Sequence, residues 1–415
     1  MSNCSSAGCD ARFPATVGRG KMYTINIESK NGRVPQPWVT FIQANDPSGL
    51  IGPPLAATYN ETALQNGISQ QIGQTASISM GPTNWQGHLY FSDAALVLPT
   101  SPANCPTDPA YTDTTNKTRF QNLEFAGSSQ SANVDITYIN WYSIPLQMQS
   151  TSPQSSGGNT RGRPKPGSQL KSLNTTLAGL TISNPATVVK SGSQIVRVIS
   201  PNAGHPFWLP LYPRFSDYLV DIFIDSAKPP LLKNTYDGVQ RPPSPDFQPQ
   251  SYTVSTLTYG GQTLNIAGTS TVLGNFTMTS DMIFGDFSSA IYLAVMNYAW
   301  SYTGAGGGSN ANGNTGDNNV FSAISRDLMA GFAYGFIGST QYGAQPSSAW
   351  EAAPANALFS SLQPTKPHYN PWANAIYRCF SDVYSFPFND FLTGSAPELA
   401  VNNGDTLTVT LLNPD

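Results

Sequence analysis

The sequence predicts a mainly β protein with a mixed α/β part, and three observations support this prediction. Short stretches in which apolar and polar residues alternate are separated by turns rich in Gly, Pro and Asn, a pattern typical of β-sandwiches and barrels. Only 11% of the 415 residues are charged. The alternation returns near the C-terminal end, after a middle part with helical patterns. We therefore expect one β-sandwich or barrel with an α/β domain inserted in it.

The first β body is expected over residues 20–150. Alternating strand patterns recur there at residues 22–28, 38–42 and 88–92. Residues 120–125, a turn at 127–130 and residues 134–148 then predict a hairpin with one long partner strand. Because residues on one face of neighbouring strands stand close together, this hairpin can point one side chain from each strand into the same groove.

The middle of the chain begins at residues 151–168, which are rich in Pro, Gly and Ser and predict a flexible connector. A mixed α/β domain is expected over residues 169–379, with helical patterns at 212–226 and 320–337. The Gly- and Asn-rich segment 304–319 predicts a flexible loop within this domain.

The tail returns to β structure. Residues 398–412 alternate around an Asn-Asn-Gly turn, which is a strong hairpin signal. We assign residues 380–415 to the sandwich formed by residues 20–150, so the chain leaves that sandwich and comes back to it.

The charge pattern excludes several classes of function. The formal net charge is −4 and no Lys/Arg-rich patch is present, so nothing favours binding to nucleic acid or to an anionic membrane. No stretch approaches the roughly 18 apolar residues of a membrane span, and residues 1–22 lack the apolar core of a secretory signal. Aromatic residues reach 11%, a composition that suits sugar recognition.

The cysteines and histidines show no metal-binding spacing. Four cysteines, Cys4, Cys9, Cys105 and Cys379, would allow two disulfides. The histidines are dispersed, and we expect them to have packing roles: His88, His205 and His368. Nothing in the sequence requires a metal or an organic cofactor, and we expect neither.

Several passages together match a known family. Asn370 precedes Pro-Trp-Ala-Asn-Ala-Ile, and Asp382 begins a passage that ends in Phe-Pro-Phe-Asn-Asp at Asp390. Glu124 stands in Leu-Glu-Phe, and sixteen residues later Asn140 stands in Ile-Asn-Trp-Tyr-Ser-Ile-Pro-Leu. These passages resemble glycoside hydrolase family 64, a family of β-1,3-glucanases whose fold is related to the thaumatin-like proteins.

The resemblance implies an inverting hydrolysis in which Glu124 is the acid. The family has an Asp as the base where this chain has Asn140, and an amide cannot remove a proton near neutral pH. Asp390 is a possible substitute, because the resemblance puts its strand near the groove. Asp135 is another, although it lies five residues before Asn140. On a continuous strand that odd offset places the two on opposite faces.

Candidate contacts to the sugar are also implied. They are Tyr142, Trp85, Trp372, Tyr384 and Asn389, of which Asn389 stands where the family has an acid. Trp141 and Tyr142 point to opposite faces of a strand, and the parity of Tyr142 favours the side of Asn140.

Three hypotheses about function remain open at this point. The chain is an endo-β-1,3-glucanase with a weakened or displaced base, or a non-catalytic protein that binds glucan or cell walls with an antifungal or toxin-like role. In the third, Asn140 is an engineered replacement of Asp. In each case the expected partner is a β-1,3-glucan such as laminarin, and we expect a secreted, extracellular monomer.

Overall fold

The computed structural model describes most of the chain. The described residues are 23–43, 51–52, 54–81, 86–101, 106–111, 113–128, 130–155, 157–180, 187–200, 233–236, 250–260, 263–271, 274–281, 301–304, 318–337, 339, 341–343, 345–359, 369–380, 382–386, 389 and 397–413.

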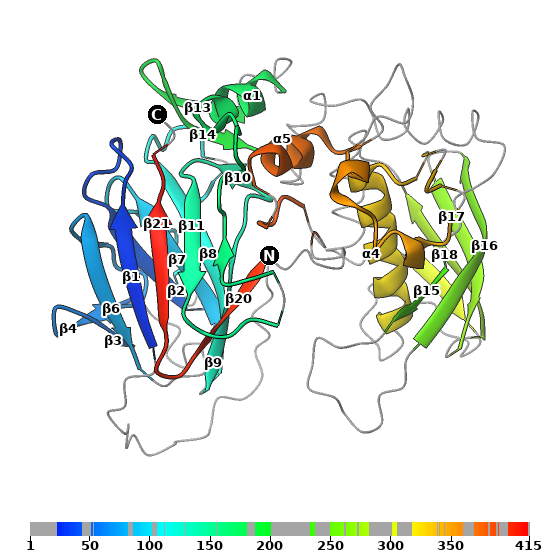
Figure 1. Ribbon diagram of the computed structural model, residues 1–415, viewed down its shortest axis with the longest axis horizontal. Helices are drawn as coiled ribbons and strands as arrows, with labels where there is room; N and C mark the ends of the chain where they lie inside the picture. The colour runs from blue at the N-terminus through cyan, green and yellow to red at the C-terminus, as the bar shows by residue number, and fades with distance from the viewer. Residues whose placement is uncertain are drawn as a thin grey trace.

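Two sheets form the first body (Figure 1). The seven-stranded sheet has the order β12 (Thr160–Arg161), β11 (Leu146–Ser150), β21 (Thr406–Leu411), β1 (Tyr23–Ser29), β6 (Thr75–Met80), β3 (Pro54–Tyr59) and β4 (Thr62–Gln65). The six-stranded sheet has the order β20 (Glu398–Asn402), β9 (Ser131–Ile136), β8 (Phe120–Gly127), β7 (Gln86–Ser92), β2 (Trp38–Gln43) and β5 (Gln70–Gln71). The expected strands near residues 22–28, 38–42, 88–92 and 398–412 are therefore present.

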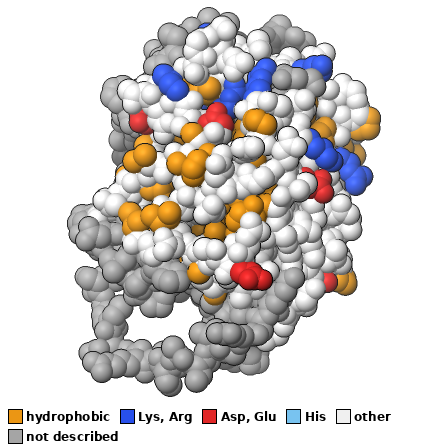
Figure 2. All heavy atoms as spheres, turned by 90° about the vertical axis from the view of Figure 1, so that its left-hand side faces the viewer, with side chains coloured by type: hydrophobic (Ala, Val, Ile, Leu, Met, Phe, Trp, Pro, Cys, Tyr) orange, Lys and Arg blue, Asp and Glu red, His pale blue; other side chains and the backbone are white. Residues whose placement is uncertain are grey.

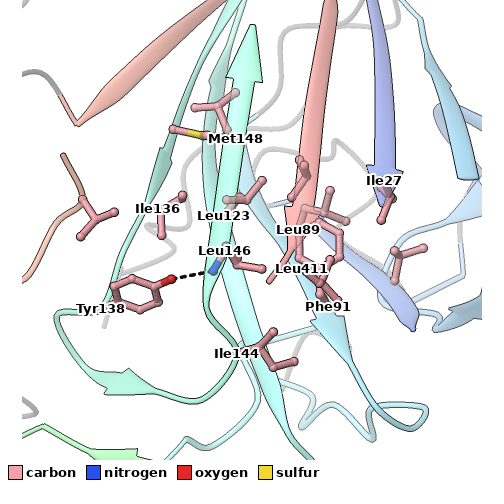
Figure 3. Packing of buried hydrophobic residues seen from close by; sticks show 14 of the residues in the cluster. Ile27, Leu89, Phe91, Leu123, Ile136, Tyr138, Ile144, Leu146, Met148 and Leu411 are labelled. Atoms are coloured by element: carbon pink, nitrogen blue, oxygen red, sulfur yellow. Dashed lines mark hydrogen bonds between the residues drawn. The ribbon is translucent and has the colours of Figure 1, made fainter. Parts of the chain in front are cut away.

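The core lies between these two sheets. Alternate residues of each strand point inward, so that Leu89 and Leu123 of one sheet meet Ile27 and Leu411 of the other (Figure 3). The chain ends are tied together by β1 and β21, which pair in parallel with Ile25 opposite Leu407. The C-terminal tail thus rejoins the sandwich by pairing β21 directly with β1.

The six-stranded sheet does not contain the expected long partner strand. After β9 the chain leaves the sheet and then forms β10 (Trp141–Tyr142), which pairs with β14 (Gln194–Ile199) in a three-stranded sheet with β13 (Val188–Ser191). Tyr138, between β9 and β10, is buried and its hydroxyl accepts a hydrogen bond from the Leu146 amide at 2.8 Å (Figure 3). The prediction of one continuous strand over 134–148 is therefore wrong, because burial of Tyr138 and pairing with β14 redirect the chain.

Residues 151–168 are built into the sandwich, which differs from the flexible connector that their composition predicts. β12 pairs with β11, and the Arg161 side chain is buried and donates to the carbonyls of Gly157, Gly158 and Thr160. The Gln154 side chain bonds both the amide and the carbonyl of Ala400. Side-chain to backbone hydrogen bonds give this Gly- and Pro-rich segment an ordered path that its composition does not reveal.

Two helices predicted to belong to the inserted domain pack on the sandwich core instead. α1 (Leu173–Gly179) buries Leu173 and Leu177 there, and α5 (Pro371–Cys379) buries Trp372 and Ile376. The Asn370 side chain caps α5 by accepting from the Ala373 amide at 3.1 Å.

A second body follows in the middle of the chain (Figure 1). Its five-stranded sheet has the order β15 (Lys233–Tyr236), β16 (Gln250–Gly260), β17 (Thr263–Ser270), β18 (Gly274–Asp281) and β19 (Ser301–Gly304). α4 (Asn318–Tyr334) lies beside it, as the helical pattern over 320–337 predicts, with Ile324, Leu328 and Phe332 buried. The Tyr252 hydroxyl donates to Asp327 and links helix to sheet.

Several sequence predictions lie outside the described residues. They concern the helix at 212–226, most of the loop at 304–319, and Cys4, Cys9 and Cys105. Cys379 is a buried free thiol. On the face shown in Figure 2, most side chains are uncharged and the Lys and Arg side chains lie in its upper half, in agreement with the 11% charged residues. Among the described helices, none is long and apolar enough to cross a lipid bilayer.

Candidate functional site

Glu124 stands in the middle of a row of polar side chains that crosses the six-stranded sheet. The strand register places His88 of β7 directly opposite Glu124, and Asp135 of β9 directly opposite it on the other side. Glu398 of β20 continues the row beside Asp135. Directly opposed residues share one face of a sheet, and Leu123 points the other way into the core. The row therefore lies on the outer face, and Glu124 is half-buried there.

His88 is held by a carboxylate from a neighbouring loop. The Nδ1 atom of His88 lies 2.6 Å from Oδ1 of Asp108, and the Tyr90 hydroxyl donates to the same oxygen at 2.8 Å. Tyr90 is buried, and its ring meets the His88 ring edge to face at 5.9 Å. These contacts fix the orientation of the imidazole.

The charges of this cluster shift one another's pKa values. Burial raises the pKa of the Glu124 carboxyl; the His88 charge opposes this rise and the Asp108 charge adds to it. Burial alone would lower the pKa of His88, but the hydrogen bond and charge of Asp108, with the charge of Glu124, raise it overall. Burial would raise the pKa of Asp108, but the hydrogen bonds from His88 and Tyr90 lower it. A carboxyl with a raised pKa beside a hydrogen-bonded histidine can exchange protons near neutral pH.

Asn140 is not on the same strand as Asp135. It occupies a bend just before β10, where its carbonyl accepts from the Ser200 amide at 2.9 Å. Its side-chain Oδ1 is buried with no hydrogen-bond partner. The prediction that Asp135 and Asn140 point to opposite faces of one continuous strand therefore does not apply. The register shows instead that Asp135 shares the face of Glu124.

The faces of Trp141 and Tyr142 are the reverse of the predicted ones. Tyr142 has 0% exposure and lies in the sandwich core against Tyr138, so it cannot stack on a sugar in this structure. Trp141 packs on the outer side with Tyr90 and Phe120, and its indole stacks on Tyr111 at 4.9 Å. The short β10 takes its orientation from β14, so parity counted along β9 does not apply to it.

The remaining predicted contacts are dispersed. Trp372 has 0% exposure and donates its indole N–H to the Tyr138 carbonyl at 2.9 Å, which makes it a core residue. Asn389 is buried, and its Oδ1 accepts from the Ser385 hydroxyl at 2.7 Å, a local structural bond. Tyr384 is half-buried and bridges Thr137. Trp85 and Asp390 lie outside the described residues.

Four residues of this face were not singled out for a role there by the sequence: His88, Tyr90, Asp108 and Asn122. Asn122 lies two residues before Glu124 on the same face, is only 2% exposed, and has an Oδ1 with no hydrogen-bond partner. The i, i+2 spacing of His88 and Tyr90 gives a strand-face signal, but nothing local connects Asp108 with them. Among the described residues, no group of three or more His, Cys, Asp and Glu side chains could hold a metal ion.

No protein-family model matches this chain, and no curated protein matches its sequence. Its structure does match solved structures. A laminaripentaose-producing β-1,3-glucanase in complex with laminaritetraose is 18% identical, with a TM-score of 0.64 over 95% of this chain and 99% of that one. A β-1,3-glucanase domain of family GH64 from Clostridium beijerinckii is 13% identical, with a TM-score of 0.57 over 94% and 98%.

A third match extends this comparison to a longer protein. The GH family 64 laminaripentaose-producing β-1,3-glucanase from Paenibacillus barengoltzii is 12% identical, with a TM-score of 0.52 over 96% of this chain and 77% of that one. All three similarities cover nearly the whole of this chain at low identity. The fold predicted from the resemblance is thereby confirmed: this chain has the fold of the glycoside hydrolase family 64 β-1,3-glucanases.

Proposed function

We propose that this chain binds a β-1,3-glucan over the outer face of the six-stranded sheet, with Glu124 as the group that protonates the glycosidic oxygen. The observation that carries this proposal is the placement of Glu124. It is the acid that the sequence resemblance selects, and it stands half-buried with a raised pKa on a fold that solved β-1,3-glucanases share. A general acid needs a raised pKa, so that it holds its proton until the leaving oxygen takes it.

Neutral polar groups near Glu124 fit a sugar better than a charged ligand. Asn122 lies two residues from Glu124 on the same face, and its carboxamide is 2% exposed with an Oδ1 that has no hydrogen-bond partner. The half-buried Tyr111 ring, which stacks on the buried Trp141 indole, adds aromatic surface on this side. Hydroxyl-rich ligands are bound by such amides and aromatic faces.

Asn140 stands where the resemblance places the general base, so activation of the attacking water is weakened. Inverting hydrolysis needs a base about 6.5–9.5 Å from the acid to activate water, and an amide cannot fill that role. A non-catalytic glucan-binding protein is therefore the second candidate function, and the amide at Asn140 favours it. Both candidates share the glucan and the face of the sheet.

Reducing-end release from laminarin and pull-down on insoluble β-1,3-glucan test the proposal together. We expect binding by the unmodified chain, binding without cleavage by Glu124→Gln, and faster cleavage by Asn140→Asp. Cellulose serves as the matched polymer with β-1,4 links and should not be retained. The assignment fails if the chain neither binds nor cleaves β-1,3-glucan and Asn140→Asp does not change this.

A polymer partner of this kind is met outside cells, so we expect the chain to act as an extracellular protein. We also expect a monomer, because the proposed site uses residues of one chain alone. Size-exclusion chromatography with light scattering checks the second expectation, which a stable dimer would contradict.

A further inference from the structure

The His88–Asp108–Tyr90 cluster has no role in the mechanism implied by the family resemblance. Asp108 accepts two hydrogen bonds at one oxygen, from His88 at 2.6 Å and from the Tyr90 hydroxyl at 2.8 Å. Tyr90 is in turn buried against Phe120, edge to face at 6.2 Å. Asp108 and Tyr90 therefore fix the orientation of the His88 imidazole.

Asp108 also decides which nitrogen of His88 is basic. A carboxylate at Nδ1 holds the proton of a neutral imidazole on that nitrogen. The lone pair is then on Nε2, which is free to accept a proton, as in hydrolases that use an Asp–His pair. The side chain of His88 is 29% exposed, so water can reach it.

The position of His88 relative to Glu124 completes the geometry. The two residues are directly opposite on neighbouring antiparallel strands, a placement that puts Cβ atoms about 5 Å apart and both side chains on one face. Each affects the pKa of the other, so their ionisable ends are close enough to interact.

Resting on the proposed glucan function, we propose that His88 is the general base of this chain and takes the role that Asn140 cannot perform. Nε2 of His88 removes a proton from a water molecule while the water oxygen forms a bond to the anomeric carbon. The bond from that carbon to the glycosidic oxygen breaks, and Glu124 gives its proton to the departing oxygen. One water is consumed, and the site is left with a protonated His88 and an ionised Glu124.

The same adjacency restores the site. The proton on His88 passes to Glu124 through a water, and both groups return to their starting states without an external acid or base. Asp108 remains ionised throughout, since its pKa is lowered by the hydrogen bonds that it accepts.

Asp135 is the competing base on this face. It is also directly opposite Glu124, but its Oδ1 is buried, whereas His88 is accessible and fixed by Asp108. Among the described residues, the other titratable groups around the row are Tyr90, Tyr111 and Glu398. Of these, Glu398 is exposed on β20 and stands next to Asp135 rather than His88.

His88→Gln tests the inference, with Glu28→Gln on β1 of the other sheet as the control substitution. We expect His88→Gln to lower laminarin cleavage about a hundredfold or more while pull-down on β-1,3-glucan is unchanged. Glu28→Gln should keep both. Asp108→Asn should lower the pKa of the base, so that the acidic limb of the kcat/KM profile moves to lower pH.

An independent readout comes from the imidazole itself. The chain has three histidines, so the proton NMR signal of His88 can be assigned by its loss in His88→Gln. Its pKa should fall in Asp108→Asn and in Glu124→Gln. A His88→Gln variant that binds glucan and still cleaves at the original rate would overturn the inference, as would an unmodified chain that binds glucan without cleaving it. Loss of all glucan binding would instead refute the proposed function, and with it this role of His88.

Discussion

Two half-buried carboxylates in this protein, Glu124 and Asp382, have similarly raised pKa values but differ in what surrounds them. Glu124 lies beside His88 and Asp108, and burial raises its pKa. Burial likewise raises the pKa of Asp382, which lies near Arg161. Asp382, however, accepts the Gly162 amide at 3.0 Å, within a segment that is bonded to the sandwich throughout.

The residues around Asp382 therefore connect residues 151–168 to the rest of the sandwich. Beside it, the Lys165 ammonium lies 3.3 Å from the centre of the Tyr377 ring, and the Lys165 amide donates to the Cys379 carbonyl at 2.8 Å. These contacts tie residues 151–168 to α5. A raised carboxyl pKa alone thus does not identify a catalytic group; a shared strand face and an oriented proton acceptor distinguish Glu124.

The largest expected effect separates the two acids by activity. Glu124→Gln should lower glucan cleavage about 10²–10⁴-fold, because the amide cannot give a proton to the leaving oxygen. Asp382→Asn should leave the rate unchanged, since Asp382 accepts the Gly162 amide and is not part of the polar row in the sheet. Reducing-end assays of both variants on laminarin check this pair. Equal losses of cleavage rate in the two variants would contradict the claim that Glu124 serves cleavage and Asp382 does not.

The next effect concerns the loop that carries Asp108. Arg197 is buried and donates four hydrogen bonds to carbonyls of that loop, those of Tyr111, Asp113, Asn116 and Thr118. Arg197→Met should lower the free energy of unfolding by about 2–4 kcal/mol, because buried carbonyls lose their partners. Urea unfolding measures it, and the exposed Lys190→Met on the neighbouring strand is the control. A change below about 0.5 kcal/mol would mean that the loop is held by other contacts.

A smaller effect is expected from Asp382→Ala. Loss of the acceptor for the Gly162 amide should cost about 1–2 kcal/mol. Asp382→Asn keeps an oxygen in the same place and should cost less. If the two substitutions are equally destabilising in urea, the charge of Asp382 rather than its hydrogen bond to Gly162 stabilises this contact.

The smallest effect is a pH dependence of stability at Lys165. Burial lowers the pKa of its ammonium in the folded chain to about 8, from an ordinary value of 10.5. Between these two pH values the unfolded chain binds more protons, so stability should rise with pH over this window and be lost again as pH falls through about 8. The slope should be absent in Lys165→Met. Thermal unfolding of both proteins from pH 7 to 10.5 would show the same slope in each if Lys165 were not responsible.

Much of the fold followed from local patterns. The alternation in β1, β2, β7 and β21 is visible in the sequence because one face of each strand must enter the core. The helix over 320–337 was likewise predicted from its apolar period. Residues 151–168 were not, since their ordered path depends on hydrogen bonds to β20 and to their own backbone rather than on apolar residues.

The candidate site was only partly predictable. Glu124 was selected by the resemblance of its hairpin to glycoside hydrolase family 64. The end of β9 at Ile136 was not predicted, because no Gly or Pro interrupts residues 137–142. The break comes from tertiary contacts of Thr137 with Tyr384 and of Tyr138 with the core. The partnership of His88 with Asp108 spans twenty residues and leaves no periodic trace. Aromatic side chains such as Trp372 fit a core as well as a sugar platform, so residue type alone misplaced them.

Calorimetric binding of a laminari-oligosaccharide to the Glu124→Gln variant tests the central claim most directly, because binding is measured there without turnover. Titration with a β-1,4-linked oligosaccharide of equal length is the control. The account predicts saturable binding of the β-1,3-linked ligand alone. No heat with either ligand, or equal binding of both, would contradict the assignment of this face to β-1,3-glucan.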